Sequence, residues 1–145
     1  MAFLRLIEAI GPMGVEPLVV WPRIDSALER LSSRGIHVLR LRLPRWRHGV
    51  SLPLFPVWLA RLRGALPREP VDLIHVNNYR SAPFGHLAAR WAGVPCLSTV
   101  REMISPDRIR QYHLRKMDGL VAVCDAVARA LVDGGVSRDL SLIHI

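Results

Sequence analysis

The sequence predicts an α/β fold, with a parallel sheet and helices on both of its faces. Short apolar runs alternate along the chain with longer segments of helical periodicity, and glycine or proline bounds most of them. Strands that are separated by helices form βαβ units, which build parallel sheets through right-handed crossovers. No internal repeat or low-complexity tract interrupts the alternation. We therefore expect one Rossmann-like domain.

The first half of the chain predicts two strands and two helices. The apolar run EPLVVW at residues 16–21 predicts a buried strand, and residues 24–35 follow as a helix that Asp25 can cap. Residues 36–43 alternate in polarity with period two, which predicts a strand near a sheet edge. After a basic, proline-bounded stretch, residues 57–66 predict a short amphipathic helix.

In the second half, apolar strands and helices alternate more clearly. The expected strands are residues 71–76, 95–100, 119–123 and 140–145. The expected helices are residues 81–94, 107–117 and 124–135. The chain begins in an apolar helical segment, without the opening strand of such a sheet, and stops inside an apolar run. We therefore expect a fragment that lacks its first strand.

Composition and charge narrow the class of protein. The 145 residues are 50% hydrophobic and 22% charged, which suits one packed domain and not a disordered tail. No apolar run reaches the roughly 20 residues of a membrane-spanning helix. Two cysteines are too few for a disulfide framework, so we expect a cytoplasmic domain without metal or cofactor. The net charge of +8 favours anionic partners such as phosphates or lipid headgroups.

Polar residues follow three of the expected strands. Ligands of open parallel sheets bind at the carboxyl ends of the strands, where loops and helix N-termini converge. Asparagines and arginines at this edge offer amide groups and fixed cations, which suit sugar hydroxyls and phosphate oxygens. The candidate substrate-binding residues are Asn77, Asn78, Tyr79, Arg80, Ser81, Cys124 and Asp125, and the candidate catalytic residues are Arg101 and Glu102.

Each of these groups has a structural alternative. Asn77 and Asn78 can shape the turn and cap the helix that follows it. Arg101 can hold a phosphate while Glu102 acts as a base or orients a hydroxyl, or the two can form a surface ion pair. Cys124 opens a helix, where capping competes with ligand binding, and no base that would activate its thiol is visible.

Other sequence features exclude several function classes. His75 lies inside an apolar strand, the usual setting of a core histidine, and the six histidines lack metal-ligand spacing. The chain has no G-x-G-x-x-G, no P-loop and no G-x-S-x-G motif. A self-contained dinucleotide enzyme, NTPase or α/β-hydrolase is therefore disfavoured.

The region between residues 40 and 68 interleaves arginine with tryptophan and leucine. This pattern suits the headgroup zone of an anionic membrane, where rings lie at the interface and guanidinium groups meet phosphates. A solvated arginine face over an ordinary core helix is the alternative, and no recognisable nucleic-acid-binding module is present. The candidate membrane-surface residues are Arg45, Trp46, Arg47, Trp58, Arg61 and Arg63.

Three segments share their order and spacing with a known family. They are LERLSSRGIHVLRLRLP, then VDLIHVNNYRSAPFGHLAARWAGVPCLSTVRE, then MDGLVAVCDAVARALVDGGVSRDLSLIHI. Together they resemble the N-terminal domain of bacterial family 4 GT-B glycosyltransferases. The resemblance implies retaining transfer of a sugar from a nucleotide-sugar donor to a glycan or lipid-linked acceptor. Residues 1–145 are then a partial acceptor-side domain, without the C-terminal donor domain.

The chain departs from that family at three places. The family's glycine-rich turn after its first strand has no counterpart here. Arg101 stands where the family often has a histidine, and Cys124 stands where a serine usually opens the helix. Glu8 and Glu16 have the spacing of the donor-side E-x7-E motif, but they lie in the wrong part of the fold.

Two other functions remain open. One is a basic membrane-surface or polyanion-binding α/β module without catalysis, and the other is a GT-B nucleotide-sugar epimerase. If the chain is the acceptor-side domain that the resemblance implies, we expect the isolated chain to have no transferase activity, since half of the active-site cleft is missing. We also expect a peripheral location at the inner face of the membrane and no nucleic-acid partner.

Overall fold

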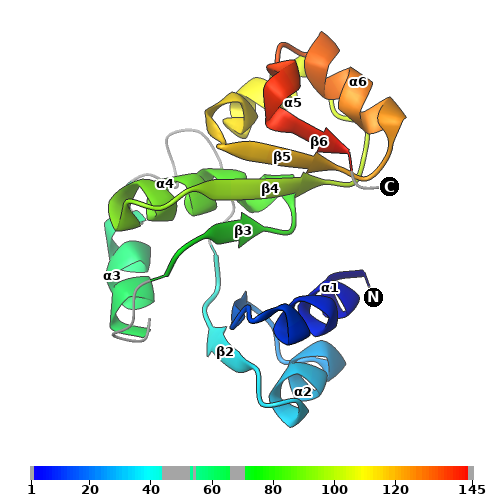
Figure 1. Ribbon diagram of the computed structural model, residues 1–145. Coiled ribbons are helices and arrows are strands. Elements are labelled where there is room, and N and C mark those ends of the chain that lie inside the picture. Colours follow the sequence, from blue (N-terminus) through cyan, green and yellow to red (C-terminus); the bar gives the residue numbers. More distant parts are fainter. Residues whose placement is uncertain (1, 44–52, 54, 66–70, 144–145) are drawn as a thin grey trace. The chain divides into compact units, whose positions relative to one another are not determined.

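The computed structural model describes residues 2–43, 53, 55–65 and 71–143. The chain divides into two compact units. The first comprises Met1–Pro44 and Phe55–Arg68, and the second comprises Arg45–Leu54 and Glu69–Ile145. Figure 1 shows the helices and strands of both units along the chain.

The first unit holds a two-stranded parallel sheet. Strand β1 (Leu18–Trp21) pairs with β2 (His37–Arg40), and helix α2 (Ser26–Ser33) connects them. Its small apolar core contains Ile7, Val19 and Leu31. The remaining elements of this unit are α1 (Ala2–Ile10), the 3₁₀ turn η1 (Gly11–Met13) and α3 (Phe55–Ala65).

The predicted cap of the second helix is confirmed. The Asp25 carboxylate accepts hydrogen bonds from the backbone N–H groups of Ala27 and Leu28, at 3.1 and 3.2 Å. The same oxygen accepts a hydrogen bond from the indole N–H of Trp21, at 3.0 Å. One side chain therefore satisfies two N–H groups that the first helical turn leaves unpaired, and also ties the helix to the end of β1.

The second unit is built on a four-stranded sheet in which every strand is parallel to its neighbour. The strands follow one another in sequence order across the sheet, and they are β3 (Ile74–Val76), β4 (Cys96–Val100), β5 (Gly119–Ala122) and β6 (Ser141–Ile143). The connecting helices are α4 (Ala82–Ala92), α5 (Pro106–Gln111) and α6 (Asp125–Asp133). Short 3₁₀ turns lie at Tyr79–Ser81 (η2), Leu114–Lys116 (η3) and Arg138–Leu140 (η4).

The connecting helices of the second unit share one apolar core with the sheet. Alternate residues of β4, namely Cys96, Ser98 and Val100, have no exposed surface. Cys96 and Val100 belong to the same cluster as Ile109 of α5 and Leu131 of α6. Since consecutive right-handed crossovers in one direction keep their helices on one side of a sheet, these helices cover the face to which Cys96 and Val100 point.

The predicted fold class is confirmed, since both units are α/β with parallel sheets and helical connections. The prediction placed helices on both faces of one sheet, whereas the connecting helices of the second unit lie on one face, because its strands follow one another in a single direction. The described strands form two sheets, however, where the sequence predicted one. The helix predicted over residues 107–117 is also wrong in extent. It ends at Gln111, because His113 adopts a left-handed conformation (φ 55°) that no α-helix contains, and a 3₁₀ turn follows. No helix in the described ranges is long and apolar enough to span a bilayer.

Candidate functional site

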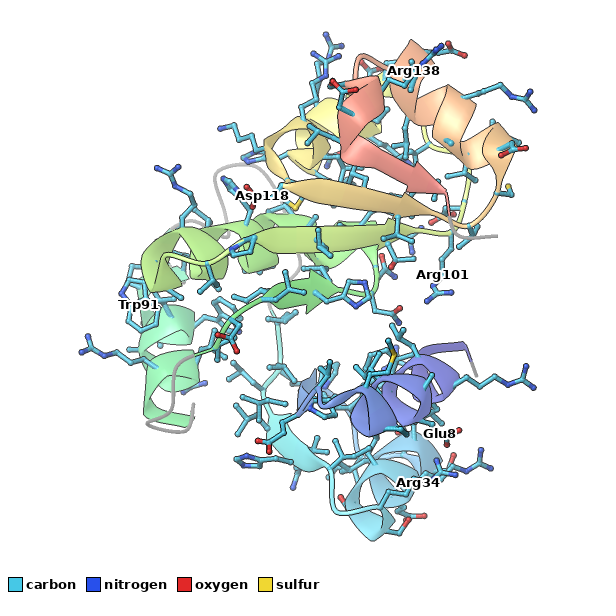
Figure 2. The ribbon with its side chains drawn as sticks, in the orientation of Figure 1. Glu8, Arg34, Trp91, Arg101, Asp118 and Arg138 are labelled. Carbon is cyan, nitrogen blue, oxygen red and sulfur yellow. The ribbon has the colours of Figure 1, made fainter. Side chains whose placement is uncertain are left out.

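The polar loops of the second unit meet at the carboxyl edge of its sheet. Because β3, β4 and β5 are parallel, the segments that follow them start at one edge, as the sequence predicted. Figure 2 shows Arg101 beyond one end of β4 and Asp118 at the other end of the sheet. Asp118 has a structural role at that opposite edge, where its carboxylate accepts a hydrogen bond from the Cys96 backbone N–H at 2.8 Å.

A small pocket lies between the first two of these loops. Its volume is about 80 Å³, and its lining residues are Asn77, Asn78, Tyr79, Thr99, Arg101 and Glu102. Five of these six are candidate site residues from the sequence. The candidates Arg80, Ser81, Cys124 and Asp125 do not line it, although Arg80 contacts a residue that does.

The two catalytic candidates have different partners from those expected. The Arg101 guanidinium donates a hydrogen bond to the side-chain oxygen of Asn77, at 2.5 Å. Glu102 forms an ion pair with Arg80, at 3.2 Å, so the alternative of an Arg101–Glu102 pair is wrong. Both members of the Arg80–Glu102 pair are about half exposed, and such pairs contribute little to stability. What the pair does is orient the Glu102 carboxylate, which lines the pocket.

The turn after β3 is held by Asn78 and Tyr79. The side-chain oxygen of Asn78 accepts a hydrogen bond from the Arg80 backbone N–H at 2.9 Å, so this residue has the turn-shaping contact that was the structural alternative to ligand binding. Tyr79 is only 2% exposed, and its ring makes an edge-on contact with Tyr112, with 5.2 Å between the ring centroids. Its hydroxyl oxygen accepts a hydrogen bond from Arg108, at 3.4 Å. These contacts within the protein fix the position of the loop after β3 without help from a ligand.

Thr99 is a pocket residue that the sequence analysis missed. Its hydroxyl lies 2.8 Å from Nε2 of His75. The His75 ring therefore has a hydrogen-bond partner, but the residue is exposed on β3, so the expectation of a core histidine is wrong. Burial, and secondarily the positive charge of Arg101, lower the pKa of His75. Both effects favour the neutral form of the imidazole. The period-two alternation of β4 was the available signal, because it places Thr99 on the opposite face from Ser98 and Val100.

The loop after β5, which carries the predicted substrate-binding residues Cys124 and Asp125, does not form part of the pocket. Cys124 occupies the N-cap position of α6, as in the structural alternative to ligand binding, but its side chain makes no capping hydrogen bond. A thiol is a weak hydrogen-bond acceptor, which explains why this position caps poorly. Asp125 lies in the first turn of α6, where its negative charge is favourable to the helix dipole. Neither residue reaches the pocket between the first two loops.

The two cysteines are expected to differ sharply in reactivity. Cys96 is buried, and burial together with the charge of Asp118 raises the pKa of its thiol to about 12. Only thiolates react with disulfide reagents, so Cys96 stays inert at pH 8, where it is protonated. Cys124 is exposed. Titration with Ellman's reagent at pH 8 should give one fast thiol in the native chain and two after unfolding, and Cys124→Ser should remove the fast one.

The predicted membrane-surface set is only partly within the described residues. Arg45, Trp46 and Arg47 lie outside them. Trp58 is 7% exposed and its ring contacts that of Phe55, at 5.8 Å between centroids. A buried ring does not fit the prediction that Trp58 lies at a membrane surface. Arg61 and Arg63 are exposed on α3.

No three His, Cys, Asp or Glu side chains in the described part of the chain come together as a metal site requires. The pocket itself is lined by one guanidinium, two carboxamides, one carboxylate and the hydroxyl-bearing side chains of Tyr79 and Thr99. Such groups bind hydroxyls and oxyanions and can take up a proton at the carboxylate.

Comparison with protein families matches residues 1–144 to the glycosyl transferase 4-like domain. Solved structures with the same fold include HepE of Anabaena in complex with UDP, at a TM-score of 0.68 and 19% identity over 97% of this chain and 39% of that chain. HepE has also been solved with UDP and glucose and with UDP-glucose. A glycosyltransferase of Rickettsia africae gives a TM-score of 0.70 and 18% identity, over 93% of this chain and 36% of that chain.

A search of curated protein sequences gives no match. At 18–19% identity the structural likeness shows the fold alone. The chain spans 39% or less of the length of these structural neighbours.

Proposed function

The chain belongs to the glycosyl transferase 4-like family, whose domain covers residues 1–144, and from this premise we propose that it is the acceptor-side domain of a retaining glycosyltransferase. The intact enzyme moves a sugar from a nucleotide-sugar donor to a glycan or lipid-linked acceptor. The observation that carries the proposal is the pocket at the carboxyl edge of β3 and β4, where the ligands of parallel sheets bind.

The donor is a nucleotide sugar held by a second domain. Support comes from HepE of Anabaena, whose fold includes that of this chain and which was solved with UDP-glucose. This chain corresponds to 38% of HepE, so the remainder of such a protein has room for a donor domain. The 145-residue chain alone then has no transferase activity, because only one side of the cleft is present.

The residues of the pocket have distinct roles in this proposal. Arg101 and the carboxamides of Asn77 and Asn78 bind and orient the acceptor. Glu102 lies at the same rim, where a carboxylate can accept a proton from, or orient, the acceptor hydroxyl. The exposed Arg61 and Arg63 of α3 support a peripheral position on the anionic inner face of the membrane, which would bring the domain to a lipid-linked acceptor.

Activity of variants in the full-length parent protein tests the proposal. Arg101→Ala and Asn78→Ala are each expected to lower kcat/KM about tenfold to a hundredfold, since each removes a hydrogen bond that involves a charged or positioned group. The measurement is transfer of labelled sugar from a panel of nucleotide sugars. Circular dichroism of each variant checks that the fold is intact.

Arg129→Ala is the matched control, because Arg129 is an exposed arginine of α6 that does not line the pocket. It should leave kcat/KM unchanged. Full activity in Arg101→Ala and Asn78→Ala would sink the site assignment, and turnover by the 145-residue chain alone would sink the two-domain proposal. Interconversion of nucleotide sugars without any acceptor would identify the epimerase in its place.

A further inference from the structure

We propose that the pocket between the loops after β3 and β4 is a subsite for a single oxyanion, the phosphate group of a phosphorylated acceptor, bound by Arg101 and by a Thr99 hydroxyl that His75 orients. All the residues concerned belong to the second unit. Arg101 and Thr99 are ligand-binding residues in this proposal, and His75 is a positioning residue that acts through Thr99.

The first argument is that the pocket presents mainly hydrogen-bond donors. The side-chain oxygen of Asn77 is engaged by Arg101, and that of Asn78 is engaged by the Arg80 backbone N–H. Each carboxamide therefore has its NH₂ group left for a ligand. The guanidinium of Arg101 contributes further N–H groups and no acceptor. A ligand that only accepts hydrogen bonds, such as an ionised phosphate, satisfies this set better than a hydroxyl, which also has a proton to donate.

The second argument is the charge of the pocket. Arg101 has no ion-pair partner among the described residues, and its one hydrogen-bonded side chain, Asn77, is neutral. The single carboxylate of the lining, that of Glu102, is paired with Arg80. At the pocket, the guanidinium groups of Arg101 and Arg80 and the carboxylate of Glu102 leave a net positive charge, since Asp125 of the loop after β5 does not line it. An anion supplies the missing counter-charge, and a charge-assisted contact to arginine is among the stronger hydrogen bonds in proteins.

The third argument is the state of the Thr99 hydroxyl. Thr99 is only 6% exposed, and its oxygen lies 2.8 Å from Nε2 of His75. When Nε2 of His75 carries the proton, it donates to the Thr99 oxygen and leaves the hydroxyl proton free to point into the pocket. An anion in the pocket favours the tautomer of His75 that is protonated at Nε2, because the Thr99 hydroxyl can then donate its proton to the anion. His75 thus sets the direction of the Thr99 hydroxyl without touching the ligand.

The size of the pocket limits what it can hold. A volume of about 80 Å³ accommodates one small polyatomic group, and it is far below the roughly 300–1,000 Å³ of pockets that enclose whole ligands. A phosphate fits this description, whereas a complete sugar must lie mostly outside. That the phosphate belongs to the acceptor rests on the proposed function, in which the donor is held by another domain.

Binding to the 145-residue chain, without any donor, tests the subsite. The probe is butyl phosphate, a phosphomonoester with a short apolar tail, and binding is followed by NMR at the His75 imidazole and the Thr99 amide. Binding should raise the pKa of His75 toward its ordinary value, because the anion offsets the charge of Arg101. Arg101→Gln should weaken binding about tenfold or more, and Arg129→Gln should leave it unchanged.

The positioning role of His75 has its own variants. Thr99→Val removes the hydroxyl at nearly constant volume and should weaken binding about threefold to tenfold. His75→Phe should weaken it equally, whereas His75→Gln keeps an N–H donor and should restore most of the affinity. Since the wild-type NMR titration needs no variant, misfolding of a His75 variant does not remove the test.

The results of these binding experiments distinguish failure of the oxyanion subsite from failure of the proposed transferase function. Absent binding, or binding that Arg101→Gln and Thr99→Val do not weaken, overturns the subsite whatever the activity of the intact enzyme. Tighter binding of UDP than of butyl phosphate at the same resonances assigns the pocket to the donor and overturns the acceptor assignment. Phosphate binding as described, in a full-length protein without transferase activity, supports the subsite and overturns the proposed function.

Discussion

Replacing Leu120 with alanine is expected to destabilise the chain by about 2–5 kcal/mol. Leu120 lies on β5 with no exposed surface, in the same apolar cluster as Val100, Ile109 and Leu131. The truncation removes buried methyl groups and leaves a cavity that the close-packed helices cannot fill without moving. Urea unfolding followed by far-UV circular dichroism measures the loss as a lower midpoint at an unchanged slope.

Val123→Ala is the matched control for Leu120→Ala, because Val123 follows β5 directly and is 37% exposed. Its expected effect is within about 0.5 kcal/mol. Equal losses for the two variants would contradict the placement of Leu120 in the core of the second unit. They would mean that β5 presents its other face to the helices.

Gly85→Ala is expected to destabilise the second unit by about 1–3 kcal/mol, despite the higher helix propensity of alanine. A Cβ atom at Gly85 would overlap Cγ2 of Val76 and lie 3.4 Å from the Cys96 sulfur. Both neighbours are on strands, and the short valine side chain has no flexible end that could move aside. The glycine therefore permits α4 to approach β3 and β4 closely, which sets the position of the loop that carries Asn77 and Asn78.

Gly64→Ala supplies the control for this prediction, since Gly64 lies in α3 and no atom of the described residues is within 4 Å of a new Cβ. It should be neutral or stabilising by up to about 1 kcal/mol. The double variant Gly85→Ala with Val76→Ala should be more stable than the sum of the two single losses, because the second change removes the overlapping methyl group. Strict additivity in urea unfolding would contradict the close approach.

Much of the fold was predictable because local patterns agree with the tertiary structure. Residues 95–100 begin with Pro95, are mainly apolar or β-branched, and are followed by Arg101, and the strand that forms there is Cys96–Val100. The helix over residues 107–117 was not predictable in extent, because its periodicity continues past the point where the chain turns. Ile109 and Leu114 are both fully buried, and the left-handed His113 between them ends the helix. Burial of both side chains is decided by neighbouring elements and not by the local pattern.

The candidate site was predictable as a set of loops but not as a set of contacts. Parallel strands end at one edge, so the meeting of Asn77 with Arg101, which lie 24 residues apart, follows from the predicted topology. The ion-pair partner of Glu102 cannot be predicted from the topology. Arg80 in the loop after β3 and Arg101 in the loop after β4 are both near it, and only the packing of the side chains selects Arg80. Thr99 was missed because a threonine inside a strand gives no local sign of lining a pocket.

The amino-acid sequence by itself determined the order of strands and helices and the edge of the sheet at which polar loops gather, because both depend on periodicity, turn residues and connectivity. It also indicated the family, through the resemblance of three segments. Only the tertiary structure decided which polar atoms remain available there. The Asn77 and Asn78 oxygens accept hydrogen bonds, Glu102 is paired with Arg80, and Arg101 has no ion-pair partner in the part of the chain that the structure describes. Those facts depend on strand register and on side-chain rotamers, which are set by contacts between residues far apart in the chain.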